Sequence, residues 1–192
     1  MRKVVFLMFL LVAVTGLAFA DNVATFGSTL STGGTITPAG VGSNILLDDY
    51  TDSGLCQAGC DLLTTLNFDN THLWIDAAQD TVIPGINTGA TIFSGTYASG
   101  SANVSCTLGS MCSALFNTTI NGTFNPAFAG FVGGLGASEF ALTGSSLASY
   151  DGPSGTYIAY STAVTFAPVP EPASLVLLGL GAFGVLRRKA LK

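Results

Sequence analysis

The sequence predicts an all-β domain, a β-sandwich or jelly roll, flanked by an N-terminal signal helix and a C-terminal hydrophobic helix. Short runs of alternating polarity, typical of strands with one buried face, predict the domain. Gly, Asn, Asp and Pro fall between these runs at positions suited to tight turns. No long pattern of 3.6-residue period appears between the two ends, so many short strands account for the interior of the chain.

The clearest strand lies near the end of this domain. We expect five of its side chains to share one buried face: Ile158, Tyr160, Thr162, Val164 and Phe166. Similar runs predict further strands at Leu62–Phe68, Leu73–Ile75, Thr91–Tyr97, Phe116–Phe124 and Glu139–Leu142. Residues suited to turns occur at Asn121-Gly122, Gly133-Gly134 and Asp151-Gly152-Pro153.

The charges are distributed unevenly along the 192 residues. All six Lys and Arg residues lie in the two end segments, whereas ten of the eleven carboxylates lie between Asp21 and Val169. Nucleic-acid binding depends on cations that neutralise phosphates, so we expect no nucleic-acid partner for this domain. The same absence excludes a lysine nucleophile or an arginine phosphate clamp there.

The first 20 residues have the three parts of a secretory signal peptide. Arg2 and Lys3 precede an apolar run, which ends at the small residues Ala18 and Ala20 around Phe19. We expect export through the Sec translocon and cleavage by signal peptidase after Ala20. The apolar run is short for a membrane-spanning helix of about 20 residues.

The last segment, residues 170–192, combines three unlike features in order. Pro170-Glu171-Pro172 forms a stiff, extended start, because proline fixes φ and donates no backbone hydrogen bond. An uncharged membrane segment follows from Ala173 to Leu186, and then the basic cluster Arg187-Arg188-Lys189. The positive-inside rule leaves this cluster in the cytoplasm and the domain outside, with the tail held in the inner membrane.

These three features resemble the PEP-CTERM sorting signal. The resemblance covers Pro170 to Lys192 alone and implies recognition of Pro170-Glu171-Pro172 by exosortase, a membrane enzyme similar to a transpeptidase. It also implies removal of the hydrophobic tail after transient anchoring, and an association with bacteria that make exopolysaccharide and biofilm. The resemblance implies nothing about residues 21–169.

Four cysteines lie in the extracytoplasmic domain of residues 21–169. An even number outside the cytoplasm indicates disulfides, and three connectivities are open. We favour the two local pairs, Cys56 with Cys60 and Cys106 with Cys112. A zinc site made by all four thiolates is the alternative, but neither pair has the two-residue spacing common in such sites.

Two weaker binding predictions concern polar residues of the same domain. If Leu73 and Ile75 face the core, Trp74 lies on the opposite face with His72 and Asp76, an arrangement that could stack on a sugar ring. Oxygen ligands at Asp48, Asp49 and Asp52 suggest a calcium site, although their spacing does not match an EF-hand. No other cofactor is expected.

Catalysis finds little support in the sequence. His72 is the only histidine, and a Ser-His-Asp set with Asp69 or Asp76 would need a serine that no Gly-x-Ser-x-Gly pattern marks. The leading hypothesis is therefore a non-catalytic protein of the cell surface or extracellular matrix, sorted through its C-terminal motif. A surface carbohydrate-binding module is the first alternative, and an extracellular hydrolase is the second.

Overall fold

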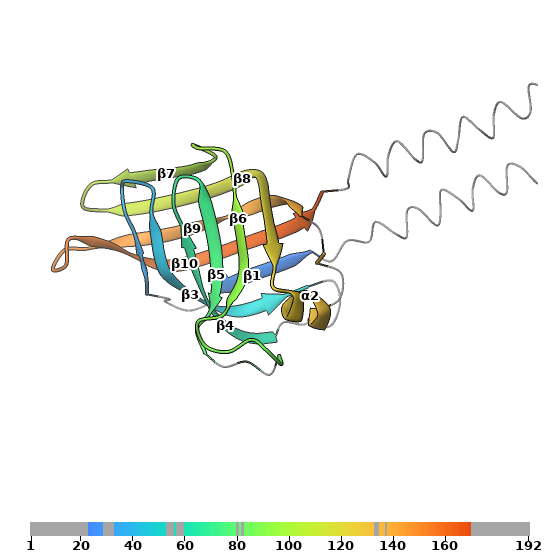
Figure 1. Ribbon diagram of the computed structural model, residues 1–192. Coiled ribbons are helices and arrows are strands. Elements are labelled where there is room, and N and C mark those ends of the chain that lie inside the picture. Colours follow the sequence, from blue (N-terminus) through green and yellow to red (C-terminus); the bar gives the residue numbers. More distant parts are fainter. Residues whose placement is uncertain are drawn as a thin grey trace, which may run out of the picture. The chain divides into compact units, whose positions relative to one another are not determined.

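The computed structural model describes residues 23–28, 33–52, 56, 60–79, 81, 83–132, 135–136 and 138–169. Within these ranges the chain forms ten strands and one short helix (Figure 1). In chain order they are β1 (Ala24–Ser28), β2 (Thr35–Ile36), β3 (Gly42–Thr51), β4 (Cys60–Phe68), β5 (His72–Ala77), β6 (Thr91–Thr96), β7 (Ala102–Thr107), β8 (Met111–Phe124), α2 (Pro126–Val132), β9 (Glu139–Asp151) and β10 (Thr156–Pro168). The predicted signal and tail helices lie outside the described residues.

Eight strands close into an antiparallel barrel. Around the ring each strand pairs with the next in the order β1, β3, β4, β5, β6, β8, β9 and β10. The ring closes because β1 also pairs with β10, from Ala24 opposite Phe166 to Ser28 opposite Thr162. The all-β prediction is confirmed, but the sandwich or jelly roll is wrong, since β1 joins the two edges that separate sheets would leave open.

A β-bulge in β10 changes which side chains face the core. Thr162, Val164 and Phe166 are buried as expected, but the register shifts between Ala159 and Ser161. Before the bulge, the buried residues are therefore Tyr157 and Ala159. Ile158 and Tyr160, which were expected to be buried with the other three, lie on the outer side. The extra residue of a bulge reverses the alternation, and its position is not marked by the polarity pattern.

Aromatic rings fill the barrel at the end that carries α2. Phe166 lies 4.5 Å from Phe93 and 5.5 Å from Phe124, measured between ring centroids. Phe128 of α2 adds a ring 5.3 Å from Tyr50. The interior of this end is therefore occupied by side chains of the protein itself.

The sequence explains the position of α2. Asn125 precedes the helix, and its side-chain Oδ1 accepts a hydrogen bond of 2.9 Å from the backbone N–H of Ala127. Pro126 occupies the first helical position, where a missing N–H costs nothing. Phe128 and Val132, four residues apart, form its buried stripe and cover the end of the barrel.

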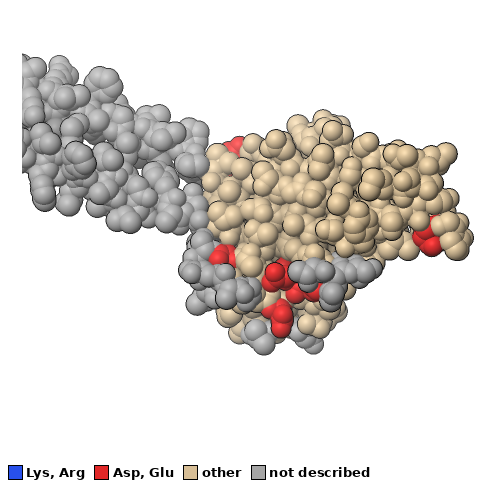
Figure 2. Space-filling view, turned by 180° about the vertical axis from the view of Figure 1, so that it is seen from behind, with Lys and Arg blue, Asp and Glu red and all other residues tan. Residues whose placement is uncertain are grey.

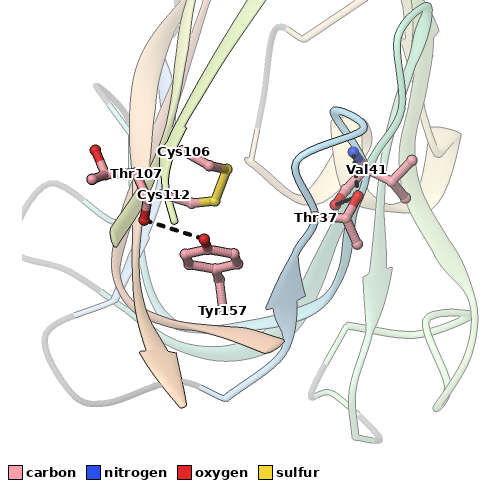
Figure 3. Close-up of a disulfide and its surroundings, with 6 residues drawn as sticks. All are labelled: Thr37, Val41, Cys106, Thr107, Cys112 and Tyr157. Atoms are coloured by element: carbon pink, nitrogen blue, oxygen red, sulfur yellow. Dashed lines mark hydrogen bonds between the residues drawn. A yellow bond between two sulfur atoms is a disulfide. The ribbon is translucent and has the colours of Figure 1, made fainter. Parts of the chain in front are cut away.

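Both favoured disulfides are present. Cys56 is bonded to Cys60, the first residue of β4, and Cys106 of β7 is bonded to Cys112 of β8. Figure 3 shows the second disulfide beside Tyr157, whose hydroxyl donates a 3.2 Å hydrogen bond to the backbone carbonyl of Thr107. The disulfide joins the two strands of the β7–β8 hairpin, and the hydrogen bond joins this hairpin to β10.

Candidate binding surface on the outer face of the barrel

Trp74 lies on the outer face of β5. Leu73 and Ile75 are fully buried, whereas His72 is exposed and Trp74 and Asp76 are partly exposed. The predicted division of this strand into a core face and an outer face is confirmed. A partly exposed indole can offer apolar ring surface to a ligand.

Sequence reasoning missed the polar neighbours that flank Trp74. Asn67 of β4 lies directly opposite Trp74 on one side, and Ser94 of β6 lies opposite it on the other. Thr123 of β8 continues the same row beyond Ser94. These residues are far apart in the chain, so only the strand register brings them together.

The polar groups of this row differ in exposure: Ser94 is exposed, Trp74 is partly exposed, and Asn67 is buried, with 7% of its surface accessible. The Oδ1 atom of Asn67 accepts a 2.8 Å hydrogen bond from the backbone N–H of Asn44, which fixes the orientation of the amide. Among the described residues, the Nδ2 atom of Asn67, the indole N–H of Trp74 and the hydroxyl of Ser94 have no hydrogen-bond partner. The exposed hydroxyl of Ser94 can therefore bond to a ligand beside the partly exposed indole, whereas the buried amide of Asn67 offers little surface on the other side.

His72 and Asp69 belong to the turn between β4 and β5. Asp69 accepts hydrogen bonds from the backbone N–H groups of Thr71, at 2.7 Å, and His72, at 2.8 Å. The bond from Thr71 is the largest cause that holds the pKa of Asp69 below its usual value. Asp69 thus has a structural role in shaping the turn.

The contacts of His72 do not assemble a hydrolase triad. Its Nδ1 atom lies 3.5 Å from the Asp69 carboxylate and 2.8 Å from the Thr71 hydroxyl. A triad needs a nucleophilic hydroxyl that is hydrogen-bonded to the other ring nitrogen, Nε2. No described residue makes such a bond to His72. The second carboxylate considered, Asp76, accepts a 2.8 Å hydrogen bond from Thr91.

The acidic stretch is split between two environments. Asp52 is buried and accepts hydrogen bonds from the Tyr50 hydroxyl, at 3.2 Å, and the Cys56 backbone N–H, at 2.8 Å. Asp49 instead lies on β3 opposite Asp61 of β4. The described residues contain no group of three or more His, Cys, Asp or Glu that could hold a metal ion, and calcium binding stays a prediction.

Charge is sparse on the visible surface. In Figure 2 several acidic residues gather near the lower edge of the visible face, and single ones lie near its other edges, with an uncharged surface between them. The described residues include no Lys or Arg. This surface repels anions and suits neutral ligands.

A small cavity near the Cys56–Cys60 disulfide also escaped the sequence analysis. It measures about 160 Å³, and its apolar lining includes Tyr50, Leu62, Phe128 and Val132. Ligand pockets are usually about 300–1,000 Å³, so this space is too small for a typical organic ligand. Burial is the main cause that raises the pKa of Tyr50, whose hydroxyl is turned toward Asp52.

The predicted targeting residues lie outside the described part of the chain. They are Ala18 and Ala20 at the signal cleavage site, Pro170, Glu171 and Pro172, the segment from Ala173 to Leu186, and the basic cluster Arg187, Arg188 and Lys189. Within the residues that the structure describes, no helix is long and apolar enough to cross a membrane.

Comparison with known proteins gives one result, at the C-terminus. No curated protein and no solved structure matches the chain. A family model, the PEP-CTERM protein-sorting motif, matches residues 168–189. The match begins at the last residue of β10, Pro168, and includes Pro170-Glu171-Pro172. The chain therefore carries the PEP-CTERM protein-sorting motif directly after its β-barrel.

Proposed function

We propose that this chain is an exported, non-catalytic protein of the bacterial cell surface or extracellular matrix, delivered by an exosortase-like enzyme. The observation that carries the proposal is the sorting motif matched at residues 168–189. The N-terminal signal pattern agrees with it, because the motif is useful only to a chain that crosses the inner membrane. The hydrophobic tail holds the protein in that membrane until it is processed.

The sorting role is tested by replacing Pro170, Glu171 and Pro172 with alanine. We expect the variant to accumulate in the membrane fraction with its tail attached, because the enzyme no longer recognises it. Fractionation and intact-mass measurement report its location and processing. Pro153→Ala, a change in the exposed turn between β9 and β10, is the matched control and should be sorted normally. Normal processing of the triple variant would refute the proposal.

A second candidate function, carbohydrate binding at the cell surface, is favoured by the surroundings of Trp74. Sugar rings have apolar faces that stack on indole and hydroxyl groups that bond to amides and hydroxyls. The exposed hydroxyl of Ser94 provides such a group beside Trp74, and the amide of Asn67, which is only 7% exposed, lies on the other side. Because the described residues carry no cation, the ligand we propose is a neutral polysaccharide, such as an uncharged exopolysaccharide.

Trp74→Ala tests the carbohydrate proposal. We expect about a tenfold or greater loss of affinity for neutral glycans, which corresponds to about 1.4 kcal/mol or more of lost stacking and burial. The measurement is a glycan array followed by titration of the bound sugar. Tyr160→Ala, which removes an exposed aromatic ring from β10, is the control and should bind normally. Equal binding by the Trp74 variant and the original protein would exclude this site.

A further inference from the structure

Strand β7 has an open edge. Among the strands that the structure describes, β7 pairs with β8 alone, and it stands at the end of the strand order, outside the closed ring. In Figure 1 no other strand borders its outer edge. An open edge exposes backbone N–H and C=O groups that can pair with a further strand.

The spacing of β7 and β8 shows which backbone groups point outward. In antiparallel pairs, Cα atoms are about 4.5 Å apart where the two residues do not exchange hydrogen bonds and about 5.5 Å apart where they do. The Cα atoms of Cys106 and Cys112 are 4.0 Å apart, so this pair belongs to the first kind. The backbone groups of Cys106 therefore point away from β8, and by alternation so do those of Val104 and Ala102.

Nothing on β7 protects this edge. Natural edge strands usually carry a lysine, a proline or a bulge that prevents pairing with another chain. β7 reads Ala-Asn-Val-Ser-Cys-Thr and pairs with β8 without a register shift. Neither β7 nor β8 contains a charged residue, and the Cys106–Cys112 disulfide keeps the edge strand in place.

We propose that β7 pairs with β7 of a second copy of this chain, antiparallel and centred on Val104. In this register Val104 exchanges hydrogen bonds with its counterpart, and Ala102 does so with Cys106 of the other copy. All three residues with outward-pointing backbone groups thereby gain partners. An antiparallel strand pair has two-fold symmetry, so one surface serves both copies.

The side chains along β7 are compatible with this register. Asn103 of each copy lies opposite Ser105 of the other in a close pair that exchanges no backbone hydrogen bonds, where the amide and hydroxyl can bond. Both side chains are exposed on the free barrel. Val104 is only partly buried and packs against the core, so a neighbouring strand would cover it further.

The charge distribution favours a second copy over a basic partner protein. A basic partner would be attracted to the acidic residues around β3 and β4, such as Asp49 and Asp61, and not to an uncharged edge. Two copies joined at β7 have no like charges opposed along the new strand pair. The domain can therefore associate with itself in spite of its negative charge.

Cross-linking tests the register directly. Two full-length copies with different tags, one carrying Asn103→Cys and the other Ser105→Cys, are produced in the same cells and oxidised with diamide. We expect a disulfide between the two tagged chains, because paired residues in this geometry satisfy the 4.4–6.8 Å Cα separation typical of disulfides. A chain with Thr143→Cys, on β9, replaces the Ser105→Cys copy as the control and should not cross-link.

A second variant places a proline at the centre of the open edge of β7. Val104→Pro removes an outward N–H while leaving the bonds between β7 and β8 intact, so it should abolish the cross-link. An intact Cys106–Cys112 disulfide in the mass spectrum and unchanged protease resistance show that the variant is folded. The proposal is overturned if Asn103→Cys fails to cross-link to Ser105→Cys, if Thr143→Cys cross-links equally well, or if another protein is captured instead. If Val104→Pro does not fold, the proposal is judged only from whether Asn103→Cys cross-links to Ser105→Cys and not to Thr143→Cys.

Discussion

Gly144→Ala should destabilise the barrel by roughly 3 kcal/mol or more. Gly144 has a φ of 155°, a conformation that residues with a side chain rarely adopt. An added Cβ would overlap the carbonyl oxygen of Ala163 and lie 2.8 Å from the Cα of Val164. Both are backbone atoms of β10, so the overlap can be relieved only by separating β9 from β10.

The effect of Gly144→Ala is measured by urea unfolding of the exported protein. Gly152→Ala is the matched control, because Gly152 lies in the turn of the same hairpin and an added Cβ there meets nothing within 4 Å. Its free energy of unfolding should change by less than about 0.5 kcal/mol. If both variants unfold at the same urea concentration, β9 and β10 do not approach each other at Gly144 as described.

Replacing Thr162 or Thr64 with valine should have opposite effects on the free energy of unfolding. Thr162 and Ser146 face each other in the barrel, and their hydroxyls form a 2.6 Å hydrogen bond. Thr162→Val leaves the buried Ser146 hydroxyl without this partner and should cost about 1–3 kcal/mol. The hydroxyl of Thr64 has no hydrogen-bond partner among the described residues, so Thr64→Val should stabilise the fold by about 1 kcal/mol.

Comparing these two variants removes the general effect of replacing threonine with valine. Both threonines are almost completely buried in strands, and both changes exchange a hydroxyl for a methyl group. The difference between their unfolding free energies therefore reports the Ser146–Thr162 hydrogen bond and the unsatisfied Thr64 hydroxyl. Equal losses in both variants would show that Thr64 has a bonding partner after all.

The sequence could predict strands but not their closure into a barrel. Alternation within β5 placed Leu73 and Trp74 on the correct faces, because that strand is regular. In β10 the same reasoning failed at Ile158 and Tyr160, since a bulge shifts the register without a clear sequence signal. Strands of β-sandwiches and strands of β-barrels show the same alternation of buried and exposed side chains. The pairing of β10 with β1 and with β2, both of which also pair with β3, distinguishes them here.

The candidate sites differ in how far the sequence could reveal them. The sorting motif is contiguous, so composition and order were sufficient to identify it. Trp74 was visible as an outward-facing aromatic residue, but Asn67 and Ser94 reach it only through the strand register. The open edge of β7 depends on which strands lie beside it, and local polarity contains no such information.

The pairing of β1 with β10 also sets the order in which the protein can fold. Hydroxyls of Thr25 and Thr165, 140 positions apart in the chain, meet at 3.0 Å across these strands. β1 can pair with β3 early, but in a chain exported N-terminus first, as we propose, β1 can meet β10 only after the strands between them have crossed the membrane. Contacts between such distant residues form slowly. On that proposed route the barrel stays open until β10, the strand that adjoins the sorting motif, has arrived.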